Sequence, residues 1–274
     1  ADAGIEHQVL DAAALRLRYP QIVVPDDGWA IFEPHGGGLL ARRAVQAVVD
    51  DACRRGAELQ HLRVMPFAGS DDPTAPITAS GARIEADFYV YACGPWLGKL
   101  FPELLGPRIF PTRQEIYYVG CAAGNTAFSP PRMPTWMDFE REWYGLPDLE
   151  ARGFKLASDR HGAAIDPDSA ERTPSPAGIA AAREFLRRRF PSLGDAPIVG
   201  SEVCQYENSA NGDLLIDRHP RHQNVWLVGG GSGHGFKHGP AVGEYLLSRL
   251  RNEIAPEPRF SLESKAQQQQ REVH

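Results

Sequence analysis

The chain has 274 residues, of which 42% are hydrophobic and 23% charged, and its formal net charge is -6 at pH 7. This length allows one large domain or two intertwined ones, and the acidic balance excludes the clustered positive charge of a nucleic-acid-binding protein. No apolar run is long enough to cross a bilayer, and the first residues lack the basic and apolar regions of a signal peptide. We therefore expect a cytoplasmic protein that binds neither membrane nor nucleic acid.

The first predicted elements are two helices and a short extended piece. A helix is expected over residues 11–19, with Asp11 as its N-cap and Pro20 at its end, and an extended piece over residues 29–32. After a glycine turn at 35–40, the segment 41–59 has the periodicity of an amphipathic helix, with Gly56 as its C-cap. One face of this helix carries Ala44, Val45, Val48, Val49 and Cys53.

Strands are predicted next along the chain. They span residues 59–67, 77–78, 83–84 and 87–93. The last of them is nearly all apolar or aromatic and ends at Gly94 and Pro95. A fully buried strand of this kind is typical of the middle of an α/β sheet.

Prolines and aromatic residues become frequent from about Pro107 to Gly200. Strands are predicted at 116–120, 136–139 and 153–158, and a helix at 176–189 with Ser175 as its N-cap and a proline at its first position. This block indicates an antiparallel sheet with one helix, inserted between two halves of an α/β domain. The final residues, 261–274, are polar, and we expect them to be disordered.

The segment 225–250 is the most informative part of the sequence. It predicts a buried strand, a glycine-rich turn at 229–235 and a helix, an arrangement that brings backbone N–H groups and a positive dipole end against a ligand. With His234 and Lys237 in the turn, an anionic or electron-rich ligand is favoured. The dinucleotide fingerprint is not matched, since His234 or Phe236 stands where its third glycine belongs. A tight turn that needs glycine for backbone reasons alone stays an alternative.

Other chemistries fit the sequence less well. The His35–Gly38 run resembles an esterase oxyanion loop, but no G-x-S-x-G elbow follows it, because Gly230–Gly233 is followed by His234. A zinc site is disfavoured because the histidines lack cysteine or carboxylate partners at ligand spacing, and the four cysteines are scattered. From the residues alone, Lys155 fits a solvated lysine on the outer face of a strand, and Cys204 fits a small buried hydrophobe.

Several motifs in order resemble one family. Gly231–Glu244, GSGHGFKHGPAVGE, is close to a G-F-S-G-H-G-F-K motif, and YGLPDLEARGFKLA and YACGPWLGKLFP match two further segments. The chain thus resembles the D-amino-acid-oxidase-type flavoproteins, in the monomeric sarcosine oxidase and N-methyltryptophan oxidase branch. The resemblance implies a mixed α/β fold, with an FAD-binding Rossmann-like domain (33–106 and 200–255), an antiparallel β substrate domain (1–32 and 107–199) and a polar tail (256–274).

The resemblance also implies roles for individual residues. Cys204 would carry FAD covalently, with a non-covalent flavin left open, and Lys155 would activate O2 by stabilising developing superoxide. Tyr144 and Tyr206 would lie beside a small-molecule amine substrate, and Lys237 would pair with its carboxylate. The implied reaction passes hydride from a C–N bond to flavin, and O2 then yields hydrogen peroxide. The implied flavin-binding residues are Ala92, Gly94, Trp96, Cys204, Gly231, Ser232, Gly233, His234, Gly235, Phe236 and Lys237, with no metal.

Two departures from the branch pattern shape the expectation. Asp159 stands where the branch has a histidine, which changes the charge facing the substrate, so it is added to the catalytic candidates. The family's opening G-x-G-x-x-G unit is absent, so we expect a truncated or partly recorded flavoenzyme whose missing N-terminal segment comes from elsewhere. Two alternatives stay open: a non-catalytic remnant, and a flavin dehydrogenase with an acceptor other than oxygen.

Overall fold

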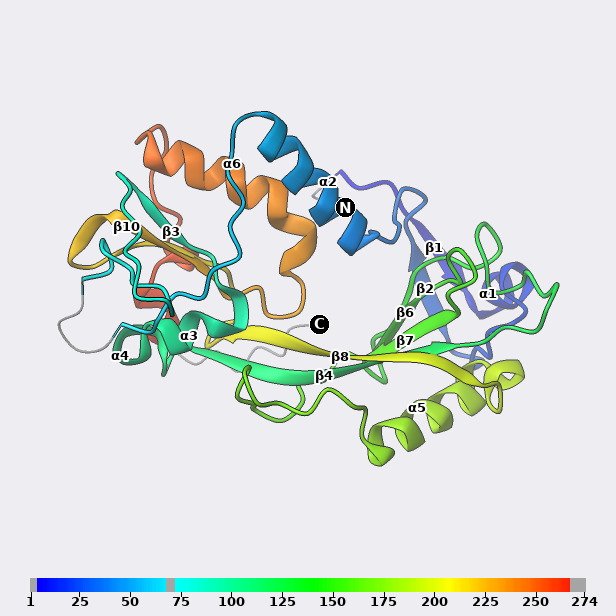
Figure 1. Cartoon of the computed structure of the whole chain (residues 1–274). Coiled ribbons are helices and arrows are strands. Elements are labelled where there is room, and N and C mark those ends of the chain that lie inside the picture. The colour runs from blue at the N-terminus through cyan, green and yellow to red at the C-terminus, as the bar shows by residue number, and fades with distance from the viewer. Residues whose placement is uncertain (1–3, 68–71, 267–274) are drawn as a thin grey trace.

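A five-stranded antiparallel sheet runs through the middle of the molecule (Figure 1). The computed structural model describes residues 4–67 and 72–266. The longest ladder joins Ile109–Val119 to Ile198–Ser209, a strand at one edge of the sheet, and these two strands pair along their whole length. In spatial order the strands are β5 (Trp136–Asp138), β6 (Trp143–Leu146), β7 (Phe154–Ser158), β4 (Ile109–Val119) and β8 (Ile198–Ser209).

One face of this sheet packs against helix α5 (Pro176–Arg189). The core between them includes Phe154 and Leu156, which are fully buried, and Phe185 from the helix. The Ser175 side chain accepts a hydrogen bond from the Gly178 N–H at 3.0 Å, and proline occupies the first helical turn. The predicted helix, its cap and the antiparallel sheet are therefore confirmed.

A second, three-stranded sheet holds the C-terminal part of the α/β region. Its order is β3 (Tyr89–Tyr91), β10 (His222–Gly229), β9 (Leu215–His219), with β3 parallel and β9 antiparallel to β10. The central strand is buried, but β3 lies at an edge among the described strands, and Val90 is 45% exposed. The prediction of a fully buried strand in the middle of a sheet is therefore wrong, because its side chains alternate between core and surface.

Helices α2 (Ala41–Arg54) and α6 (Gly239–Leu250) lie on the side of the five-stranded sheet opposite α5 (Figure 1). Both were expected, and α2 ends at Arg54, one residue short of its C-cap Arg55, with Gly56 at a φ of +100° just beyond, close to the predicted end. Arg43 holds α2 with a bidentate contact to Glu150 at 2.6 and 2.7 Å. The apolar face of α2 stays exposed, with Val48 68% accessible, so burial of this face does not hold the helix in place.

The N-terminal hairpin and the segment after α2 complete the fold. Strands β1 (Gln8–Asp11) and β2 (Trp29–Phe32) pair around helix α1 (Ala12–Arg18), whose Asp11 cap accepts from the Ala14 N–H at 2.8 Å, as predicted. The strand predicted at 59–67 is wrong, since that segment contributes only an isolated bridge from Val64 to Thr78. Two short helices, α3 (Leu97–Leu100) and α4 (Pro102–Leu105), precede β4. No helix in the described ranges is long and apolar enough to span a bilayer.

The beginning of the polar tail is folded. Residues 258–260 and 263–266 form short 3-10 turns, and Lys265 is only 1% exposed. Its Nζ donates to Asn211 Oδ1 at 2.9 Å and to the Arg259 carbonyl at 2.6 Å. The expectation of disorder is therefore wrong for 261–266, because a satisfied buried ammonium anchors the segment, while 267–274 lies outside the described residues.

This buried lysine predicts a rise in stability with pH. Burial lowers the pKa of Lys265 to about 8 from 10.5, although Asp213 acts in the opposite direction. Between these values the unfolded chain binds the extra proton, so the free energy of unfolding increases with pH by at most about 1.4 kcal/mol per pH unit. Urea unfolding of the wild type and Lys265→Met across this window should give a slope difference. Tyrosine titration is common to both proteins, so parallel curves would contradict the prediction.

Candidate functional site

Four of the predicted site residues share one face of the five-stranded sheet. Lys155 pairs with Tyr118 on β4 and Cys204 pairs with Gln114 on the same strand. Positions 114 and 118 of β4 point to the same face, because side chains two or four residues apart do so. Tyr144 on β6 and Tyr206 on β8 pair, directly or through β7, with even-numbered positions of β4, so they point to this face as well. The four residues on this face, which is opposite α5, are Tyr144, Lys155, Cys204 and Tyr206.

Two tyrosines and the lysine form the centre of this group. The hydroxyl groups of Tyr144 and Tyr206 are 3.0 Å apart and hydrogen-bonded. The Lys155 Nζ lies 5.5 Å from the centroid of the Tyr144 ring, within cation–π range. Burial raises the pKa of both phenols, and the Asp159 carboxylate raises them further. Both tyrosines are therefore neutral hydrogen-bonding groups at neutral pH.

Lys155 is not a solvated surface lysine. Burial lowers the pKa of its ammonium, while Cys204 and Glu202 act in the opposite direction. Burial also raises the pKa of the Cys204 thiol, which stays protonated at neutral pH. The strand alternation predicted from sequence holds, because Phe154 and Leu156 point into the core and Lys155 points away from it.

Asp159 lies directly after β7, where it can act on the tyrosine pair. Its backbone N–H donates to the Glu142 carbonyl at 2.7 Å, which fixes the chain at the end of the strand. Its carboxylate influences Tyr144 and Tyr206 electrostatically. The structure therefore brings this fifth predicted residue beside the other four.

The glycine turn at 229–235 packs closely against the Tyr206 ring. A Cβ atom added to Gly233 would lie 2.4 Å from Tyr206 Cε2, and the φ angle of Gly233 is +82°. Ser232 is buried, and its hydroxyl accepts from the Ser209 N–H at 3.2 Å. Glycine at 233 is thus required by contact with Tyr206 as well as by backbone conformation.

Three N–H groups of the turn, those of Ser232, His234 and Gly235, are bonded to backbone carbonyls inside the protein, which limits the sequence-based expectation that the turn offers its N–H groups to a ligand. The Ser232 N–H donates to the Glu207 carbonyl at 2.8 Å, and the Gly230 and Gly231 N–H groups favour the ionised Glu207 carboxylate and so act to lower its pKa. The His234 and Gly235 N–H groups both donate to the Gly231 carbonyl. An anionic ligand on the turn would have to replace bonds already made inside the protein.

Glu207 is the residue that sequence reasoning missed. Burial raises its pKa to about 7, against the opposing effect of the two glycine N–H groups. Its Oε1 atom is buried without a hydrogen-bond partner in the described part of the chain. No local pattern around it in the sequence signals the role, because the partners lie more than twenty residues further along the chain.

The remaining predicted site residues lie outside this cluster. Lys237 and Phe236 are exposed on a 3-10 turn (Gly235–His238), and Lys237 makes no ion pair within the described ranges. His234 Nε2 lies 3.2 Å from the Gly212 carbonyl. Ala92 is exposed, Gly94 has a φ of +54°, and Trp96 Nε1 donates to Asp168 at 2.8 Å.

The C-terminal histidines form two separate pairs. The rings of His219 and His222 are 5.0 Å apart, and those of His234 and His238 are 6.2 Å apart. Burial lowers the pKa of His219 to about 4. Among residues 4–67 and 72–266, no group of three or more His, Cys, Asp or Glu side chains could hold a metal ion.

Comparison with known proteins places the chain in a family. Residues 1–249 match the FAD dependent oxidoreductases. The chain is 33% identical over 260 residues to monomeric sarcosine oxidase of Bacillus sp. (strain B-0618), covering 91% of this chain and 65% of that protein. It is 30% identical to N-methyl-L-tryptophan oxidase of Salmonella heidelberg (strain SL476), covering 86% of this chain and 62% of that protein.

A solved structure agrees in fold. The fructosyl amine:oxygen oxidoreductase (amadoriase I) of Aspergillus fumigatus superposes with a TM-score of 0.79 at 18% identity, covering 96% of this chain and 65% of that chain. The chain thus spans less than two thirds of the length of these relatives. The mixed α/β fold and the motifs quoted above agree with the match over residues 1–249. The chain belongs to the FAD dependent oxidoreductase family.

Proposed function

We propose that this chain forms the substrate face and part of the flavin-binding region of an oxidase that acts on a secondary amine or N-methyl amino acid. The observation that carries the proposal is the convergence of Tyr144, Lys155, Cys204 and Tyr206 on one sheet face, with Asp159 beside them. The names of the relatives, a sarcosine oxidase and an N-methyltryptophan oxidase, support the same substrate class. We also propose the two-domain division given above.

The residues present fit an FAD group between the sheet and α6. Cys204 supplies a free, partly buried thiol on the sheet face. Helix α6 lies on the same side of the sheet as Cys204, and no atom lies within 4 Å of a Cβ placed on its Gly239 or Gly243. Glycine in a helix costs about 1 kcal/mol relative to alanine, and close approach of a ligand is one reason to keep it. The remaining proposed flavin contacts are Ala92, Gly94, Trp96 and residues 231–237.

The chain's own residues have separate proposed roles. FAD, when bound, supplies the acceptor for hydride from the amine carbon. The neutral Tyr144–Tyr206 pair orients the substrate by hydrogen bonding, and the Asp159 carboxylate favours an ammonium group beside it. The Lys155 cation stabilises negative charge that develops on dioxygen, because an ammonium in a partly buried site acts at low dielectric. Lys237 would pair with a substrate carboxylate.

The test is the visible spectrum of the purified chain before and after acid precipitation. We expect flavin bands that remain with the pellet in the wild type and move to the supernatant in Cys204→Ser. The control is Cys121→Ser, a partly buried cysteine of the same chain, which should behave as the wild type. Addition of an N-methyl amino acid should bleach the bands and produce hydrogen peroxide.

Each other outcome contradicts a defined part of the proposal. Flavin that moves to the supernatant in the wild type would exclude the covalent link. Bleaching without peroxide would replace the oxidase with a dehydrogenase. A chain without flavin bands would contradict cofactor binding by this chain on its own.

A further inference from the structure

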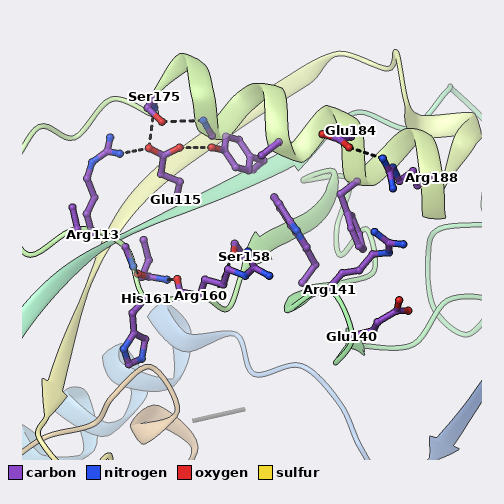
Figure 2. A pocket seen from close by; sticks show the side chains of 18 residues that line it. Arg113, Glu115, Glu140, Arg141, Ser158, Arg160, His161, Ser175, Glu184 and Arg188 are labelled. Carbon is purple, nitrogen blue, oxygen red and sulfur yellow. Dashed lines mark hydrogen bonds and ion pairs between the residues drawn. The ribbon is translucent and has the colours of Figure 1, made fainter. Parts of the chain in front are cut away.

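A second cavity lies on the other face of the five-stranded sheet, between the sheet and α5. Its volume is about 590 Å³, within the range of small-molecule sites. Figure 2 shows Arg160 and Arg141 on the side of the cavity facing α5, which carries Glu184 and Arg188. Tyr144, Lys155, Cys204 and Tyr206 do not line it. The cavity therefore excludes these four residues of the proposed flavin site, although Gln114, which pairs with Cys204, also lines it.

Most charges around the cavity are already paired. Arg113 pairs with Glu115 and Arg160 with Glu142. Arg188 contacts Glu184 at 2.7 Å. Glu140 lines the cavity and pairs at 3.2 Å with Arg189, which does not line it. These pairs balance one another and leave little net charge for a ligand.

Arg141 is the exception. Within the described ranges its guanidinium makes no ion pair, and its Nε is buried without a hydrogen-bond partner. A guanidinium stays charged at any physiological pH. The Nε has no accessible surface, but the two Nη groups make no hydrogen bond within the described ranges. A planar acceptor such as a carboxylate can bond both Nη groups at once.

The wall next to Arg141 is aromatic. The Trp143 ring stacks on Phe185 with a centroid separation of 5.0 Å and an interplanar angle of 15°. Trp143 is only partly buried, and both residues line the cavity. Glu140 and Glu184 also line the cavity, but each is paired with an arginine, so Arg141 supplies the charge that a ligand would meet. Within the part of the chain that the structure describes, an unpaired guanidinium beside an aromatic wall suits a ligand that has a single negative charge and a flat apolar body.

We propose that this cavity binds a small aromatic carboxylate, with its carboxylate on Arg141 and its ring against Trp143. This site is independent of the proposed flavin chemistry and of whether the chain retains FAD. The ligand class follows from one guanidinium unpaired within the described ranges, carboxylates that are already neutralised by other arginines, and an apolar wall.

Titration of the full chain with phenylacetate, followed by calorimetry, tests the site. We expect a dissociation constant of about 1 mM for the wild type, weakened at least about tenfold by Arg141→Gln. Ala181→Trp, an exposed lining position on α5, should also abolish binding by filling the cavity. The matched control is Arg251→Gln, an exposed arginine at the end of α6, which should bind as the wild type.

Circular dichroism of each variant confirms that it is folded before binding is compared. Absence of binding to the wild type at concentrations up to about 10 mM would overturn the proposal. Binding that survives both Arg141→Gln and Ala181→Trp would also overturn it, because the acid would then lie elsewhere on the molecule.

Discussion

Replacing Lys155 by methionine is expected to slow reoxidation of the reduced flavin by dioxygen by about 100-fold or more. Methionine is similar in length to lysine but uncharged, so the substitution removes the partly buried cation beside Tyr144. Reduction of the flavin by the amine should change far less, because that step does not place negative charge on oxygen. Stopped-flow spectroscopy separates the two steps when reduction is followed without oxygen and reoxidation is followed after mixing with oxygenated buffer.

The control for this prediction keeps the charge and changes the shape. Lys155→Arg should retain more of the oxygen reaction than Lys155→Met, because a guanidinium remains cationic. Lys99→Met removes a lysine that pairs with Asp166 and Asp168 away from the sheet face, so both steps should keep their wild-type rates. Equal slowing of reduction and reoxidation in Lys155→Met would contradict the assigned role, and would indicate a structural effect on the whole site.

Local patterns predicted the parts of the fold that depend on neighbouring residues. The helix at 176–189 was found with both ends correct, because its serine cap, first-turn proline and apolar spacing agree. The direction of Lys155 followed from alternation between Phe154 and Leu156. The apolar residues of segment 59–67 suggest a strand, but a strand also needs a partner elsewhere in the chain. In the structure this segment forms one isolated bridge, and the local sequence does not reveal that.

Contacts between distant strands could not be predicted in this way. The hydrogen bond between Tyr144 and Tyr206 joins residues 62 positions apart, and it depends on the register of β6, β7, β4 and β8. The Glu207 carbonyl accepts the Ser232 N–H of the glycine turn, a contact that the strand–turn–helix pattern does not reveal. The edge position of β3 also depends on which strands lie beside it rather than on its own composition.

Replacing Gly233 by alanine is expected to lower the free energy of unfolding by about 3 kcal/mol, from backbone strain and overpacking together. The added Cβ would lie 2.4 Å from Tyr206 Cε2, and the φ angle of +82° disfavours any side chain. The tyrosine ring cannot move away freely, because its hydroxyl is bonded to Tyr144 at 3.0 Å. Urea unfolding measures the change, and loss of the tyrosine pair should also impair amine oxidation.

The matched substitution is Gly239→Ala, at the first residue of α6. Gly239 has helical angles, φ -47° and ψ -50°, and no atom lies within 4 Å of an added Cβ. Alanine there should therefore stabilise the protein without flavin by about 0.5–1 kcal/mol. If α6 borders the flavin as proposed, the same methyl group should weaken flavin retention, so stability and cofactor binding would change in opposite directions.

A Gly233→Ala protein as stable as the wild type would mean that the turn does not press on Tyr206. An unchanged flavin content in Gly239→Ala would place the cofactor away from this end of the helix.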